Sequence, residues 1–140
     1  MLYERGSRVF VMAESETVDG FWVASPPFTA HERASLADRE LAEVVLEALA
    51  HSSAGVLTPP RSENPFAPVL RLAGARSFTQ FMTGSRAVRI VVTDDEVEVI
   101  PTRNAGPRGG FTFLSDQSVR VSTDAAGLSG ALATGLTRSR

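Results

Sequence analysis

The densest group of residues that could do chemistry follows a predicted hairpin in the second half of the chain. Within 101–111 lie Arg103, Asn104, Arg108, Gly109 and Gly110. Adjacent glycines can present backbone N–H groups to an anion, and guanidinium groups bind anions directly. The same glycines also permit a positive φ in a connection between strands. The stretch therefore predicts a shaped loop, either structural or anion-binding, with the structural interpretation favoured over catalysis.

Two groups of carboxylates are candidates for binding. Asp94 and Asp95 lie together between two apolar segments, where the turn-forming tendency of Asp explains them without a function. Glu40, Glu43 and Glu47 follow i, i+3, i+7 spacing along one face of a predicted helix. Such a face is solvated by default, and the sharper hypothesis is a docking surface for a basic partner.

Other reactive side chains are scarce. His31 and His51 have no metal-ligand spacing with acids or with each other, and there is no cysteine. We expect His51 at a helix end and His31 exposed in the polar segment before that helix. No G-x-S-x-G elbow accompanies a serine, and the absence of lysine excludes a P-loop. The sequence therefore predicts no catalytic residue, no metal and no cofactor.

Composition predicts one ordinary folded domain over residues 1–140. The hydrophobic fraction is 43% and the charged fraction 21%, with a net charge of −2. Residues 1–50 carry nine acids and four arginines, whereas residues 51–140 carry seven acids and ten arginines. The acidic first part of the chain can steer a basic partner, but a net-acidic domain is a poor candidate for general nucleic-acid binding.

The start of the chain resembles neither a secretory signal nor a membrane anchor. Residues 1–8 lack an apolar run and a small-residue cleavage site, and no later stretch has the length of a membrane span. Without cysteine, nothing indicates an oxidising compartment. We therefore expect a cytoplasmic protein without membrane contact.

The first half predicts a hairpin and a helix. Arg8–Ala13 and Phe21–Ala24 are apolar runs separated by a turn-prone segment, and Pro26–Pro27 is expected to end the second strand. Apolar residues at helical spacing then predict a helix over Leu36–Ala50, capped by Ser35. Residues 52–64 are rich in Ser, Pro and Gly and are expected to form a loop.

The second half predicts two short helices, a clear hairpin, two more strands and a terminal helix. The hairpin turn at Asp94–Asp95 would pair Val92 with Val97 and Ile90 with Val99. In chain order, the expected elements are helices over 65–73 and from Ser77, strands over 86–93, 96–101, 111–114 and 118–122, and a helix over 124–136. The chain is thus predicted to be a single α+β domain with a mostly antiparallel sheet and helices packed against it.

Several phrases spread over nearly the whole chain carry a resemblance to a known family. They are 41–49 (LAEVVLEAL), 52–56 (SSAGV), 68–70 (PVL), 73–78 (AGARSF) with Phe81 and Met82, 101–104 (PTRN) and 109–111 (GGF). On these residues the chain resembles immunity proteins of bacterial contact-dependent growth inhibition systems. The most distinctive part is the segment from Pro101 to Phe111.

This resemblance implies a non-enzymatic protein, monomeric or homodimeric, that binds and neutralises a cognate contact-delivered toxin domain, commonly a nuclease. The acidic groups Glu40, Glu43, Glu47, Asp94 and Asp95 are then candidate contacts for the toxin. Two alternatives come from other classes. One is a small-molecule or anion-binding enzyme that uses the 101–111 loop, and the other is a structural or chaperone-like subunit.

Overall fold

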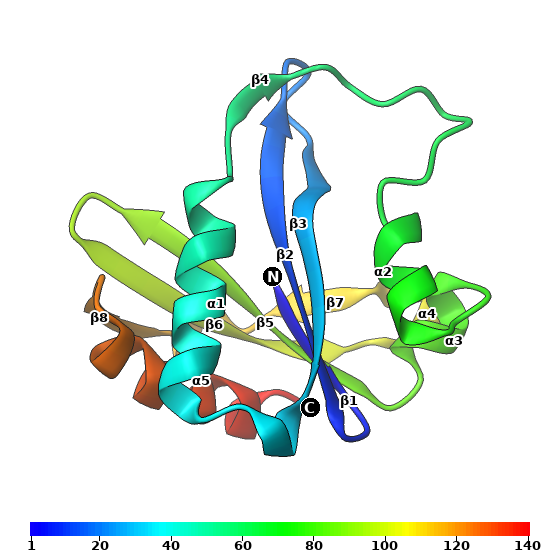
Figure 1. Cartoon of the computed structure of the whole chain (residues 1–140). Helices are drawn as coiled ribbons and strands as arrows, with labels where there is room; N and C mark the ends of the chain where they lie inside the picture. The colour runs from blue at the N-terminus through cyan, green and yellow to red at the C-terminus, as the bar shows by residue number, and fades with distance from the viewer.

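A four-residue strand at the start of the chain, β1 (Leu2–Arg5), joins two long hairpins into one sheet. The computed structural model of the chain describes residues 1–140, and its main strand order is β3-β2-β1-β5-β6-β7. β1 pairs antiparallel with both β2 and β5. The sheet is strongly twisted, so that β2 and β3 run across the direction of β5 and β6 (Figure 1).

The remaining strands and helices follow in a simple order. The elements are β2 (Arg8–Thr17), β3 (Trp22–Glu32), η1 (Arg33–Ser35), α1 (Asp38–Ala50), β4 (Ala54–Val56), α2 (Ala67–Ala73), α3 (Phe78–Met82), β5 (Ser85–Thr93), β6 (Glu96–Asn104), α4 (Gly106–Gly109), β7 (Phe111–Phe113), η2 (Ser115–Gln117), β8 (Val119–Ser122) and α5 (Ala125–Arg138). β4 pairs parallel with the end of β2, and β8 pairs antiparallel with β6. The expected α+β class and mostly antiparallel sheet are confirmed. None of the helices has the length and apolar character needed to cross a membrane.

The two faces of the sheet bury separate cores because successive strand residues point to opposite sides. Leu2, Val9 and Val11 lie in a core with α1 and α5. Tyr3 and Phe10 lie in the other core, under α2 and α3. Figure 1 shows α1 on one side of β2 and β3, and α2 and α3 on the other side. Both faces of β2 are therefore covered by helices.

The second core is mainly aromatic. Tyr3 packs edge to face against Phe66, Phe81 and Phe111, with ring centroids 5.7, 5.3 and 5.5 Å away. Phe81 is fully buried and also meets Phe10 at 5.6 Å. Edge-to-face pairs add to the free energy of area burial, so this cluster fixes α2 and α3 on the sheet. Ser77 caps α3 by accepting the Gln80 N–H, as predicted.

The register predicted for the second hairpin is confirmed. Val92 pairs with Val97 and Ile90 with Val99, and Asp94 takes a positive φ of 49° in the two-residue turn. β6 extends beyond the predicted end at Pro101 to Asn104. The loop that follows is consequently shorter than expected, and a single helical turn, α4, fills its centre.

The prediction that Pro26–Pro27 ends the second strand is wrong. β3 runs through both prolines to Glu32, and the prolines lie opposite the register shift between Met12 and Ala13. Because the ladder skips both positions, neither missing N–H costs a hydrogen bond. His31 is therefore in β3 opposite Val9, not in a polar lead-in, and its Nε2 is buried without a hydrogen bond inside the protein.

Three other boundaries differ from the expectation. β1 was not predicted. α1 begins at Asp38 with Ala37 as N-cap, and the Glu40 carboxylate, not Ser35, accepts the Ala37 N–H at 2.8 Å. The expected loop over 52–64 contains β4, a strand too short to be visible in its sequence.

Gly135 lets α5 approach the sheet closely. A Cβ at this position would lie 2.7 Å from Val99 Cγ1 and 3.0 Å from Val88 Cγ1, and both valines are fully buried. Gly130 lies in the same helix, and a Cβ there would meet nothing within 4 Å. The two glycines are thus matched in helix propensity but opposite in packing.

We expect Gly135→Ala to lower the free energy of unfolding by about 1–2 kcal/mol, since overpacking costs more than the helix propensity gained. Gly130→Ala should raise it by about 0.5–1 kcal/mol through propensity alone. Chemical denaturation of both variants measures the difference. Equal stabilisation by the two substitutions would contradict the close packing of α5 on β5 and β6.

Candidate functional site

The structure leaves the predicted acidic groups on separate surfaces. Glu40, Glu43 and Glu47 are exposed along α1. Glu40 is engaged with the helix N-terminus, and Glu43 Oε1 lies 3.3 Å from Arg39 Nε. His51, at the end of α1 as predicted, contacts the Glu47 carbonyl through Nδ1 at 2.8 Å. The role of these glutamates in binding stays a prediction.

Asp94 and Asp95 form the exposed turn between β5 and β6. They therefore belong to a different element from the α1 glutamates. Across the whole chain, no group of three or more His, Cys, Asp or Glu side chains is placed to hold a metal ion. The acidic candidates are therefore surface charges, not a shared acidic centre.

The 101–111 loop uses most of its polar groups internally. Asn104 Nδ2 donates to the carbonyls of Met82 and Ser85 at 2.7 and 3.0 Å, and Asn104 Oδ1 accepts the Gly106 N–H at 3.0 Å. The Gly110 N–H donates to the Gly106 carbonyl at 2.9 Å, so it is not free to bind an anion. The two pockets that Glu14 and Trp22 line do not touch this loop.

The remaining loop candidates serve the backbone or lie exposed. Gly110 has a positive φ of 65°, which allows the chain to turn from α4 into β7. Gly109 approaches Ala105 so closely that an added Cβ would lie 2.6 Å from the Ala105 Cβ. Arg103 and Arg108 are exposed and form no ion pair. The contacts of Asn104 and the glycines thus favour the structural interpretation of this loop.

We expect Asn104→Ala to lower the free energy of unfolding by about 2–3 kcal/mol, because it leaves two carbonyls without their donor. Arg103→Ala removes an adjacent exposed charge and should change stability by less than about 0.5 kcal/mol. Chemical denaturation compares the two variants. If Asn104→Ala leaves the free energy of unfolding unchanged, the structural role of this side chain is wrong.

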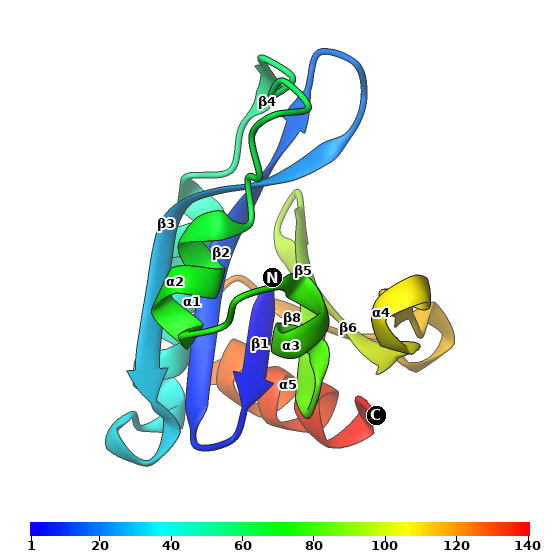
Figure 2. The same ribbon diagram turned by 90° about the vertical axis from the view of Figure 1, so that its right-hand side faces the viewer.

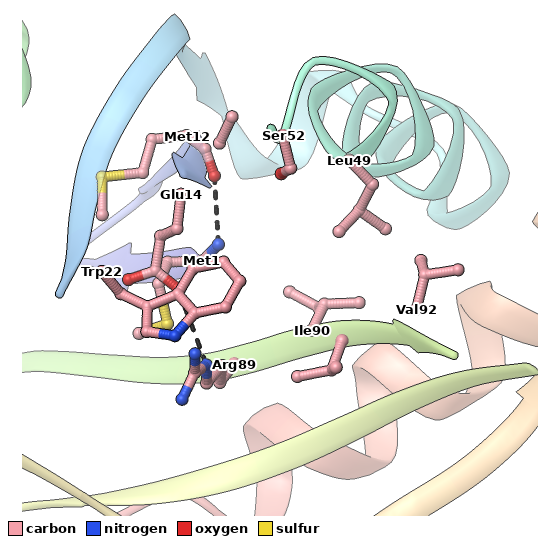
Figure 3. Close-up of a pocket in the computed structure, with 11 residues that line it drawn as sticks. Met1, Met12, Glu14, Trp22, Leu49, Ser52, Arg89, Ile90 and Val92 are labelled. Atoms are coloured by element: carbon pink, nitrogen blue, oxygen red, sulfur yellow. Dashed lines mark hydrogen bonds and ion pairs between the residues drawn. The ribbon is translucent and has the colours of Figure 1, made fainter. Parts of the chain in front are cut away.

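The strongest concave feature was not predicted from the sequence. A pocket of about 290 Å³ lies between β2 and β5, beside Met1. Its lining comes from Met1, from β2, β3 and β5, and from Leu49 and Ser52 at and just after the end of α1. Figure 3 shows Leu49, Ile90 and Val92 at one end of this pocket and Glu14, Trp22 and Arg89 at the other.

Arg89 organises the polar end of this pocket. Its guanidinium carbon lies 5.3 Å from the Trp22 ring centroid and 5.0 Å from that of Phe113, and its Nε is 3.7 Å from Glu14 Oε2. The Arg89 and Glu14 side chains are each 22% exposed. Through these cation–π contacts and this partly desolvated ion pair, Arg89 of β5 holds β2, β3 and β7 in position.

A second, more open pocket of about 380 Å³ adjoins the first one. Both pockets are lined by Met12, Glu14 and Trp22, and the second also contacts Phe66 and Phe78 of the aromatic core. We call this second pocket the aromatic groove. Trp22 is 53% exposed although it is the largest apolar side chain of the protein. An exposed tryptophan beside a groove is typical of a binding surface.

The end of the first hairpin extends the apolar surface. In Figure 2, the ends of β2 and β3 and the adjoining β4 project beyond the helices. Val18, Phe21 and Leu57 in this region are 62%, 64% and 85% exposed. The only available sequence signal was two consecutive aromatic residues, Phe21 and Trp22, directly after Gly20 at a predicted turn.

Burial changes the titration of two groups near these pockets. Desolvation lowers the pKa of the Met1 amino group below its ordinary value, while Glu14 acts to raise it and Arg89 to lower it. This group donates to the Met12 carbonyl at 3.0 Å. Burial, and secondarily the Glu14 carboxylate, raises the pKa of Tyr3 far above its ordinary value. Tyr3 therefore remains neutral as long as the fold is intact.

Comparison with solved structures identifies the fold. A protein of unknown function from Neisseria meningitidis is 17% identical, with a TM-score of 0.79 over 99% of this chain and 93% of that chain. A chain of the CdiA-CT/CdiI toxin and immunity complex from Yersinia pseudotuberculosis is 14% identical, with a TM-score of 0.78 over 99% of this chain and 95% of that one. No protein-family model and no curated protein matches the sequence. The chain thus has an α+β fold that also occurs in a toxin and immunity complex.

Tyr3 is the only tyrosine of the protein, so its ionisation can be followed by tyrosinate absorbance. The folded pKa is raised above the unfolded value of about 10, so this group stabilises the fold below that pH and loses its contribution as the pH rises further. We expect tyrosinate absorbance to appear together with loss of circular dichroism. Tyr3→Phe should unfold at a higher pH. Ionisation near pH 10 in an intact fold would contradict the burial of the hydroxyl.

Proposed function

We propose that this protein is a cytoplasmic, non-enzymatic immunity protein that binds and neutralises a cognate toxin domain delivered by cell contact. The observation that carries the proposal is the similarity of 99% of the chain to a chain of a toxin and immunity complex. The motifs described in the sequence analysis point independently to the same family. The exposed aromatic residues around the two pockets provide a surface suited to a protein partner.

We further propose that the toxin is a nuclease. Nucleases bind the phosphate backbone and therefore present basic surfaces. The net charge of this protein is −2, and its acidic excess lies entirely in residues 1–50, because residues 51–140 carry more arginines than acids. Opposite charges on the two proteins would accelerate their encounter and would cover the nucleic-acid site of the toxin.

The proposal predicts a toxin-like domain encoded next to this gene, and the direct test is co-expression of the two proteins. We expect the two proteins to co-purify as a stoichiometric complex, and we expect cells that express both to survive a toxin that kills cells expressing it alone. Size-exclusion chromatography with light scattering gives the stoichiometry and shows whether the free protein is a monomer or a homodimer. Recovery of no complex, together with no protection, would overturn the proposed function.

The exposed glutamates of α1 are proposed to steer the toxin. Reversing Glu40, Glu43 and Glu47 to Arg should slow association by about tenfold at low salt, with a much smaller effect at high salt. Stopped-flow kinetics measure the rates. Because Glu40 also caps α1, a Glu40→Gln variant controls for helix destabilisation. Unchanged association rates would place the steering charges elsewhere, and the same reversal at Asp94 and Asp95 tests the other candidate group.

A further inference from the structure

The aromatic groove combines apolar walls with a single charge. Tyr3, Trp22, Phe66 and Phe78 are four of its ten lining residues. Phe66 and Phe78 meet edge to face, with ring centroids 5.2 Å apart, and Phe78 is 38% exposed. Glu14 is the only charged residue in the lining. The groove therefore offers a long apolar path that leads to one carboxylate.

The Glu14 carboxylate is only partly neutralised. Its Oε2 lies 3.7 Å from Arg89 Nε, which is a long contact for an ion pair, and Oε1 makes neither a hydrogen bond nor an ion pair inside the protein. The side chain is 22% exposed, so solvent screens it less than it screens a fully exposed carboxylate. One oxygen of Glu14 is thus available to an additional cation.

The surrounding segment favours a positively charged occupant. Residues 9–32, which form most of the first hairpin, contain four acids and no lysine or arginine. Glu16 pairs with Trp22 across β2 and β3, which places a second carboxylate on the sheet face that carries Glu14. Glu16 forms no ion pair within the protein. A cation that enters the groove therefore meets Glu14, which Arg89 and the Met1 amino group neutralise only in part, and has Glu16 nearby.

We propose that the aromatic groove receives a lysine or arginine side chain from a basic surface segment of the protein partner. The aliphatic stem lies along Trp22, Phe66 and Phe78, and the cationic head group binds Glu14. Lysine and arginine are the side chains that combine a long apolar stem with a permanent positive charge. This inference rests on the proposed function, because the partner is the toxin domain, and it identifies the surface that holds that domain.

The groove and the α1 glutamates have different roles in this arrangement. α1 ends beside the first pocket, where Leu49 and Ser52 contribute to the lining. The exposed glutamates of α1 act at long range on the rate of encounter, whereas a partly desolvated contact at Glu14 acts on the rate of dissociation. Substitutions in the two regions should therefore alter different rate constants.

Isothermal titration calorimetry with the purified partner toxin domain measures the affinity, and surface plasmon resonance with the same domain measures the dissociation rate. We expect Glu14→Gln to weaken binding at least about tenfold and to reduce its salt dependence, and Phe78→Leu or Trp22→Leu to weaken it about tenfold or more, mainly through faster dissociation. Because these side chains are partly exposed, we expect all three variants to fold, and thermal unfolding checks this. Asp116→Asn and Leu72→Ala, which alter an exposed acid and an exposed apolar residue outside the groove and outside α1, should change affinity less than about threefold.

The outcomes separate this inference from the proposed function. If the wild-type protein binds the toxin and the groove variants bind equally well, the groove assignment is wrong and the immunity function stands. If the wild-type protein does not bind the toxin at all, both fail. Tight binding by the groove variants together with a homodimer that dissociates on Phe78→Leu would show instead that a second copy of this chain occupies the groove, and would overturn the proposal.

Discussion

The whole architecture depends on the pairing of β1 with strands on both of its sides. Its four residues connect a hairpin formed by β2 and β3 to a hairpin formed by β5 and β6. Leu2 enters the core under α1 and α5, and the neighbouring Tyr3 enters the aromatic core. One dipeptide thus links both layers of helices to the sheet. A short central strand can do this because adjacent residues of a strand point to opposite faces.

The concave surface lies at the Leu2 end of β1. There β2 and β5 continue past their pairs with Leu2, and side chains from both faces of the sheet reach the opening. A gap in a sheet would ordinarily expose apolar side chains to water without compensation. Arg89 closes one end by lying between two aromatic rings and beside Glu14. The concave surface therefore depends on the strand order, which places the short β1 between β2 and β5.

Local patterns predicted the elements that local interactions determine. The turn at Asp94–Asp95 and the alternation around it were sufficient for the register of β5 and β6, and helical spacing was sufficient for α1 and for α5. β1 was not predicted because four residues are too few to show the alternation of a strand. Only its pairing with β2 and β5 identifies it. Glu14, Trp22, Arg89 and Phe113 come from four different strands, so no spacing in the sequence could reveal that they meet. Ser35 does not cap α1 because it lies in η1, and the helix begins only at Asp38, with Ala37 as its N-cap.

The paired prolines of β3 affect how this molecule meets other chains. β3 is an edge strand, and an edge strand presents unpaired backbone groups to any other extended chain. Pro26 and Pro27 carry no N–H, and the bulge beside them interrupts the spacing that an added strand would need. The outer edge is thus divided into two segments, 22–25 and 28–32, that an added strand cannot pair with continuously. Pairing of a second extended chain along the whole edge is therefore disfavoured, while the side chains on the sheet face stay available for selective contacts.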